Sequence, residues 1–89
     1  MKRRVRVVIK GIVQGVFFRA NIEKETKKLR LTGYVCNVED YVEAVFEGED
    51  EKVKDILEFC AIGPKGVKVL VIEITEQEYV GEFEDFKVR

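Results

Sequence analysis

The chain has 89 residues, of which 46% are hydrophobic and 37% are charged, and its 16 basic and 17 acidic side chains leave a net charge of −1. This length predicts a single domain, residues 1–89, with a core sufficient for folding without metals or disulfides, and the near-neutral charge argues against a nucleic-acid or membrane partner. No apolar run approaches the roughly 20 residues that span a bilayer and no signal peptide opens the chain, so we expect a cytoplasmic protein, and we expect it to be a monomer.

The charged side chains are mostly lysine and glutamate, and their share exceeds the usual value of about 25%. A surface of this kind, rich in ion pairs, is typical of heat-adapted proteins. The composition therefore predicts a thermophile-like protein.

Two residue types that commonly carry catalysis, histidine and serine, are absent from the chain. Without histidine, neither a Ser-His-Asp triad nor a Cys-His pair can form. The two cysteines, Cys36 and Cys60, lack metal-ligand spacing, and in a reducing cytosol we expect free thiols. Any chemistry must therefore use arginine, asparagine, backbone amides and carboxylates.

The first third of the chain predicts a strand, a loop and a helix. Residues 4–10 alternate apolar and charged side chains, which is typical of a half-buried strand. Residues 11–15 follow neither a strand nor a helix period. From Phe18 to about Leu31 the apolar residues recur every three or four positions, which predicts an amphipathic helix.

The middle of the chain predicts a β-hairpin. Residues 34–38 and 41–47 are rich in β-branched and aromatic side chains, and only Glu39 and Asp40 separate them. Asp50 then stands where it could cap a second helix, whose apolar face includes Val53 and Ile56.

The last third of the chain predicts two strands. Gly63 and Pro64 end the second helix. Val67, Val69, Val71 and Glu73 then alternate along one face of a strand that continues through Ile74. A short strand, Phe83 to Val88, follows Gly81.

The predicted order is strand, helix, strand, strand, helix, strand, with a short extra strand. Because β-α-β crossovers are right-handed, two such units around a central hairpin place both helices on one face of an antiparallel sheet. The pattern thus predicts an α+β fold, the ferredoxin-like β-α-β-β-α-β sandwich, with a short fifth edge strand. This architecture hosts many activities and does not itself indicate a function.

The segment between the first strand and the first helix is the candidate functional site. It reads Gly11-Ile12-Val13-Gln14-Gly15-Val16-Phe17-Phe18-Arg19. Its two glycines allow successive amides to face one concavity at the positive end of the helix dipole, where a phosphate binds well. The guanidinium of Arg19 could hold two phosphate oxygens. The alternative is a tight loop beside an arginine paired to a carboxylate.

This segment resembles the signature of the acylphosphatase family: glycine, any residue, Val-Gln-Gly-Val, any residue, an apolar residue and arginine. A second family motif has its counterpart in Gly33-Tyr34-Val35-Cys36-Asn37, and the strand that follows, residues 42–48, is also similar to the family pattern. The resemblance extends over nearly the whole chain.

The resemblance implies an enzyme that hydrolyses a small-molecule acyl phosphate without metal, cofactor or covalent intermediate. Arg19 would bind the phosphoryl oxygens, and Asn37 would orient the attacking water. The residues implied in substrate binding are Gln14, Gly15, Val16, Phe17, Phe18 and Arg19.

The chain departs from the family pattern at the hairpin. The turn after Asn37 is one residue shorter than usual and lacks its glycine, and glutamate tolerates positive φ poorly. We therefore expect either a strained turn or a one-residue slip that would mis-aim Asn37.

Two alternatives remain open. A non-catalytic phosphate- or anion-binding module would keep Arg19 and lose hydrolysis. An RNA-binding domain would share the order of elements, but one face of residues 41–47 is acidic and the aromatic RNA-binding consensus is absent.

Overall fold

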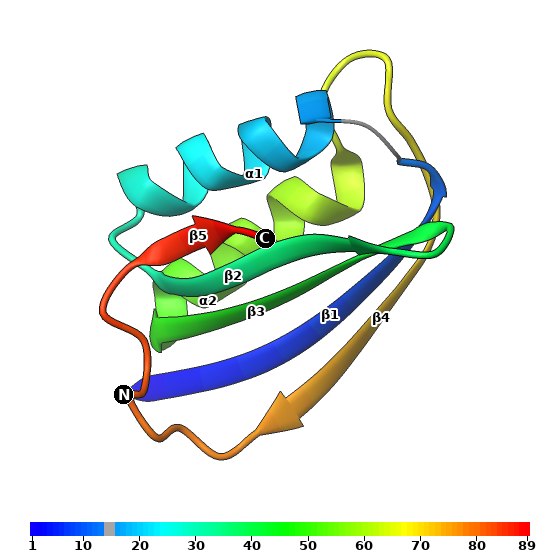
Figure 1. Cartoon of the computed structure of the whole chain (residues 1–89). Coiled ribbons are helices and arrows are strands. Elements are labelled where there is room, and N and C mark those ends of the chain that lie inside the picture. Colours follow the sequence, from blue (N-terminus) through cyan, green and yellow to red (C-terminus); the bar gives the residue numbers. More distant parts are fainter. Residues whose placement is uncertain (14–15) are drawn as a thin grey trace.

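The computed structural model describes residues 1–13 and 16–89, in which five strands and two helices follow one another (Figure 1). In chain order the elements are β1 (Lys2–Ile12), α1 (Val16–Lys28), β2 (Thr32–Val38), β3 (Tyr41–Glu49), α2 (Asp50–Ile62), β4 (Lys68–Gln77) and β5 (Phe86–Val88).

The strands form one sheet in the order β4-β1-β3-β2-β5. The four long strands pair antiparallel, and β5 joins the free edge of β2 as a short parallel strand. Helix α1 packs over β2 and β5, and α2 packs over β1 and β3, so that both helices cover the same face (Figure 1). The ferredoxin-like order, the shared helix face and the short edge strand are confirmed.

The core lies between the helices and the sheet. Alternation along β1 buries Val5, Val7 and Ile9 completely, and the helical spacing of α1 buries Phe18 and Ile22. Fully burying an aliphatic side chain contributes roughly 1.5–3 kcal/mol. The periodicity read from the sequence therefore identifies the packed faces correctly.

In β4 the predicted alternation is wrong beyond Val69. A bulge interrupts the pairing with β1, because Lys10 pairs with Val71 and Gly11 pairs with Val69. The extra residue is Leu70, and it reverses the direction of every later side chain. Val71 and Glu73 therefore lie outward, while Ile72 packs against the core.

The predicted cap of α2 is also wrong. Glu49 occupies the N-cap position and makes no side-chain capping bond, and Asp50 is the first helical residue. The backbone N–H of Asp50 donates to the carbonyl of Met1 at 2.8 Å, and its carboxylate accepts from Arg3 at 3.3 Å. The start of β1 thus provides the contacts that a local cap would have provided.

Helix α1 ends at Lys28, three residues before the predicted end. Arg30 has φ +59°, and the N–H groups of Arg30 and Leu31 donate to the carbonyls of Lys27 and Thr26. These two bonds form the Schellman motif that terminates many helices. Neither α1 nor α2 is long and apolar enough to cross a membrane.

The sheet face opposite the helices carries a buried carboxylate. Glu47 is 1% exposed, and its Oε2 accepts from Arg4 at 3.3 Å and from the N–H groups of Val80 and Gly81 at 3.2 and 3.1 Å. Arg4 also pairs with Glu82. The segment between β4 and β5 is thereby held against the open face.

We expect Glu47→Ala to lower the free energy of unfolding by about 3 kcal/mol, because it leaves Arg4 and two N–H groups without their buried acceptor. Chemical denaturation measures the change. The matched control is Glu73→Ala. Glu73 is exposed, and its carboxylate forms a long ion pair of 3.9 Å with Lys10, so its loss should lower the free energy of unfolding by about 0.5 kcal/mol or less. Equal effects of the two substitutions would contradict this account of Glu47.

Candidate active site

Arg19 lies in the first turn of α1, immediately after the buried Phe18. Phe18 fixes the start of the helix to the core and thereby sets where the arginine emerges. The Nε atom of Arg19 is buried and has no hydrogen-bond partner within residues 1–13 and 16–89. Buried donors normally have partners, so an orphaned guanidinium nitrogen indicates a position suited to a ligand oxygen.

Asn37 is the penultimate residue of β2. It pairs with Val42 of β3, whose side chain is buried in the core, so Asn37 lies on the helix-covered face of the sheet. Its Oδ1 is buried and likewise accepts no hydrogen bond from the part of the chain that the structure describes. An unpaired amide oxygen is a suitable acceptor for a water hydrogen.

The fold brings Arg19 and Asn37 to the same end of the sheet. Helix α1 packs against β2, and the charge of Arg19 is one of two that oppose the rise that burial and Glu43 cause in the pKa of Cys36, the residue next to Asn37. The first turn of α1 holds no acidic side chain. Its positive dipole end is therefore not neutralised and favours an anion.

Part of the predicted substrate-binding set lies outside the described residues. Gln14 and Gly15 belong to that part of the loop, and the side chain of Val16 is not described either. Phe17 follows on α1, where it is exposed and its carbonyl accepts a 2.8 Å hydrogen bond from Nδ2 of Asn21. The predicted roles of the loop amides stay predictions.

The shortened hairpin keeps its register. Val38 pairs with Tyr41 and Asn37 with Val42, so the slip that would mis-aim Asn37 does not occur. The turn is instead strained, because Glu39 has φ +54°, a left-handed conformation that costs a non-glycine residue roughly 1–2 kcal/mol.

We expect Glu39→Gly to raise the free energy of unfolding by about 0.5–1 kcal/mol. Glycine removes this strain, and the greater conformational entropy of glycine in the unfolded chain offsets only part of the gain. Thermal or urea denaturation measures it. Asp40→Gly is the control: Asp40 does not have positive φ, and glycine there should destabilise the protein. A loss of stability in Glu39→Gly would disprove the strain.

Both cysteines are free thiols, as predicted. Cys36 is half-buried on β2, and burial followed by the nearby Glu43 carboxylate raises the pKa of its thiol, with Arg89 and Arg19 opposing the rise. Complete burial raises the pKa of Cys60 to about 12. Neither environment favours a thiolate at neutral pH.

We expect iodoacetamide at pH 7.5 to alkylate Cys36 more slowly in the folded protein than in urea, because fewer thiolates are present when the pKa is raised. The folded-state rate at Cys36 should increase as the pH rises above 9, while Cys60 should react only after unfolding. Mass spectrometry of the two cysteine peptides measures both rates. Rapid alkylation of folded Cys36 at pH 7.5 would contradict the raised pKa.

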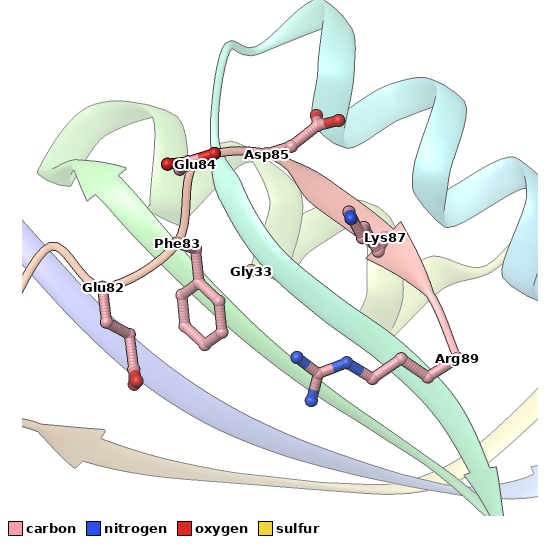
Figure 2. Close-up of a pocket in the computed structure, with 7 residues that line it drawn as sticks. All are labelled: Gly33, Glu82, Phe83, Glu84, Asp85, Lys87 and Arg89. Carbon is pink, nitrogen blue, oxygen red and sulfur yellow. The ribbon is translucent and has the colours of Figure 1, made fainter.

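A cavity of about 320 Å³ lies beside β5, and its lining includes neither Arg19 nor Asn37 (Figure 2). Its lining carries both signs of charge and one aromatic ring, from Gly33, Glu82, Phe83, Glu84, Asp85, Lys87 and Arg89. Figure 2 shows the side chain of Arg89 extending across β2. The ring of Tyr34 on β2 packs edge-on against the ring of Phe83, with centroids 5.9 Å apart, and under the guanidinium of Arg89. These contacts support the strand that carries Asn37.

Within the described residues, no three His, Cys, Asp or Glu side chains come together in a way that could hold a metal ion. The absence of a metal or cofactor from the reaction stays a prediction.

Comparison with known protein families identifies relatives of this chain. The family model described as acylphosphatase matches residues 5–88. The chain belongs to the acylphosphatase family. The acylphosphatase of Syntrophus aciditrophicus (strain SB) is 42% identical over 89 residues, which cover 99% of this chain and 93% of that relative. The resemblance found from the two motifs is confirmed.

Solved structures of acylphosphatases have the same fold. The enzyme from Coxiella burnetii superposes with a TM-score of 0.91 at 35% identity, covering 99% of this chain and 93% of the other. The enzyme from Bacillus subtilis gives 0.92 at 31% identity, covering 100% and 99%.

Two features near the site were not predicted from the sequence. Arg89 stacks on Tyr34, with its guanidinium carbon 4.2 Å from the ring centroid. The bulge at Leu70 lies beside the end of β1. The contact of Arg89 with Tyr34 joins the end of the chain to β2, and the bulge at Leu70 depends on how β4 pairs with β1. Neither feature leaves a local pattern in the sequence.

Proposed function

We propose that this protein is an acylphosphatase, which hydrolyses the carboxyl–phosphate bond of an acyl phosphate to a carboxylate and inorganic phosphate. The observation that carries the proposal is a pair of buried atoms, Arg19 Nε and Asn37 Oδ1, that have no hydrogen-bond partner among residues 1–13 and 16–89 and lie at one end of the sheet in a chain of the acylphosphatase family. The reaction requires a hydrogen-bond donor for the phosphate and an acceptor for the attacking water, and these two atoms could serve as that donor and that acceptor.

Arg19 binds the phosphoryl group in this proposal. A guanidinium presents a planar set of N–H donors that fits two phosphate oxygens, and it stays charged at every physiological pH. Backbone amides of residues 14–18, at the positive end of α1, complete the binding site. Together they stabilise the charge that develops on the equatorial phosphoryl oxygens.

Asn37 positions the nucleophile. Its Oδ1 accepts a hydrogen bond from the attacking water and its Nδ2 can donate a second bond, so the water is held in one orientation. The water must lie opposite the leaving carboxylate for in-line attack on phosphorus. Positioning of this kind lowers the barrier without any proton transfer to the protein.

The chemistry suits a chain without histidine. An acyl phosphate loses a carboxylate, which is stable at neutral pH and needs no general acid. Phosphoryl transfer through a loose transition state depends mainly on positioning and charge stabilisation. One guanidinium, several amides and one side-chain amide can provide both.

The proposal is tested with an aromatic acyl phosphate and purified protein in the presence of EDTA, with phosphate release as the measurement. The unsubstituted protein should release phosphate. We expect Arg19→Ala to lose at least about 100-fold in kcat/KM and also its binding of inorganic phosphate, because both depend on the guanidinium. Asn37→Ala should lose turnover by a similar factor and keep phosphate binding.

Two variants serve as matched controls. Arg30→Ala removes an arginine that lies just beyond the opposite end of α1, and Asn21→Ala removes an asparagine of α1 whose side chain bonds only to the helix backbone among the described residues. Both should keep full activity. Full activity in Arg19→Ala would refute the site, and phosphate binding without any hydrolysis by the unsubstituted protein would favour the non-catalytic anion-binding module.

A further inference from the structure

The C-terminal segment, residues 78–89, is attached to the sheet mainly by polar contacts. It crosses from β4 at one edge of the sheet to β5 at the other edge, past the start of β1 (Figure 1). Within residues 78–89, all of which the structure describes, Phe86 alone is buried, and it stacks on Phe46 with ring centroids 5.6 Å apart. Segments with few buried apolar contacts open at a lower free energy than the core.

Glu47 anchors this segment on the open face of the sheet. Its carboxylate accepts from the N–H groups of Val80 and Gly81, and from Arg4, which also pairs with Glu82. Hydrogen bonds to a carboxylate are stronger than those between neutral groups. One side chain of β3 therefore provides most of the polar hold on the segment before β5.

The anchored segment ends as the outer neighbour of β2. The N–H group of Gly33 donates to the carbonyl of Asp85 at 3.0 Å, and the N–H group of Arg89 donates to the carbonyl of Val35 at 2.8 Å. Between these two bonds β5 pairs in parallel with β2. Val35 lies two residues before Asn37. Without residues 78–89, β2 would be the edge strand of the sheet, paired only with β3.

The anchor is not fully satisfied. The other carboxylate oxygen of Glu47, Oε1, is buried and has no hydrogen-bond partner among residues 1–13 and 16–89. A buried oxygen without a partner carries a desolvation cost, which water removes once the segment lifts. The anchored and open arrangements are therefore closer in free energy than the bonds to Oε2 alone would make them.

We propose that Glu47 is a positioning residue for hydrolysis, which acts on Asn37 through the segment that it anchors. With residues 78–89 in place, β2 is held from both sides and Asn37 keeps the attacking water in line. When the segment opens, β2 becomes an edge strand and the water is misplaced, while Arg19 stays in position because Phe18 fixes the start of α1. The inference rests on the proposed function, and a displacement of about 1 Å can cost roughly 100-fold in rate.

The first test separates turnover from phosphate binding. Glu47→Ala should lower kcat for an aromatic acyl phosphate by about tenfold and leave the dissociation constant of inorganic phosphate unchanged. Glu47→Gln should recover most of the lost kcat, because its amide oxygen can still accept from Val80 and Gly81. Weakened phosphate binding in Glu47→Ala, or a Glu47→Gln protein no faster than Glu47→Ala, would overturn the positioning role.

Ile56→Ala is the matched control for lost stability. Ile56 is fully buried in α2, which packs over β1 and β3, and truncation of a buried isoleucine is strongly destabilising. At a temperature well below unfolding, its kcat should equal that of the unsubstituted protein. A loss of kcat in Ile56→Ala equal to that in Glu47→Ala would show an effect of general destabilisation and would overturn the proposal.

Phe83→Ala weakens the attachment of the segment without removing the buried carboxylate, and so tests the proposal even if Glu47→Ala does not fold. The half-buried ring of Phe83 contacts Tyr34 of β2 and lies 5.2 Å from the guanidinium carbon of Arg4. We expect a kcat about threefold lower with unchanged phosphate binding. Tyr79→Ala, which removes an exposed ring of the same segment, should keep full kcat. An unchanged kcat in Phe83→Ala would contradict the proposal.

A double-mutant cycle tests whether Glu47 acts through Asn37. If it does, Glu47→Ala introduced into the Asn37→Ala protein should lower kcat no further, because the side chain that the segment positions is already absent. A further loss of about tenfold, equal to that in the unsubstituted background, would show that the two residues act independently.

Amide hydrogen exchange followed by NMR measures the opening itself. The N–H groups of Gly33, Gly81 and Arg89 all bond across the boundary of the segment, so they should share one protection factor, lower than that of Val7 in the centre of β1. Three unrelated protection factors, or protection as high as that of Val7, would overturn the opening of the segment as a unit.

The positioning role and the proposed function fail differently. If the unsubstituted protein hydrolyses no acyl phosphate, the proposed function fails and the positioning role fails with it, while hydrogen exchange still reports whether residues 78–89 open together. If the protein hydrolyses acyl phosphate and the variants at Glu47 and Phe83 all keep full kcat, the positioning role fails and the proposed function stands.

Discussion

The position of Asn37 depends on the register of the ladder between β2 and β3, which runs without interruption from Thr32 opposite Glu47 to Val38 opposite Tyr41. Because side chains alternate between faces, a shift of one residue would move Asn37 from the helix-covered face to the open face, away from Arg19. Gly33 fixes this register as well. A Cβ atom there would lie 1.8 Å from the carbonyl oxygen of Val45, so no other residue allows the two strands to approach as they do.

The open face of the sheet holds the same strands together through paired charges. Arg6 donates to Glu43 through Nε at 2.7 Å and approaches it through Nη2 at 2.6 Å, while Arg4 meets the buried Glu47. Most exposed ion pairs contribute little on their own. Networks that include a buried carboxylate contribute more, and here arginine supplies the positive charges. The open face thereby stabilises the strands whose opposite side carries the site.

The site itself needs few functional groups because the reaction needs few. In the proposed mechanism, the N-terminus of α1 would provide a dipole and backbone donors, Arg19 would provide charge, and Asn37 would orient the water. All three are positioned by packing against the core, since Phe18 fixes the helix and Val42 fixes the strand pairing opposite Asn37. A rigid scaffold of this kind keeps the groups in place before the substrate arrives, which is the main source of catalytic power in phosphoryl transfer.

The sequence alone determined the order of the elements, the buried faces of β1 and α1, and the family. Alternation and helical spacing are local properties, so Val5, Val7, Ile9 and Phe18 could be assigned to the core without any knowledge of their partners. The motifs around Arg19 and Asn37 also named the two residues that the fold brings to one end of the sheet. For Gln14, Gly15 and Val16 the motif remains the sole basis of the assignment.

Only the tertiary structure decided the bulge at Leu70, the role of Asp50 and the geometry of the turn at Glu39. The bulge leaves Leu70 without a partner in β1, and it reverses Val71 and Ile72 although their local pattern is regular. Asp50 meets Arg3, which is 47 residues away in the chain. Glu39 accepts an unfavourable φ because the paired strands on both sides hold their register. Each outcome depends on contacts between distant segments, and such contacts leave no periodic signal in a single sequence.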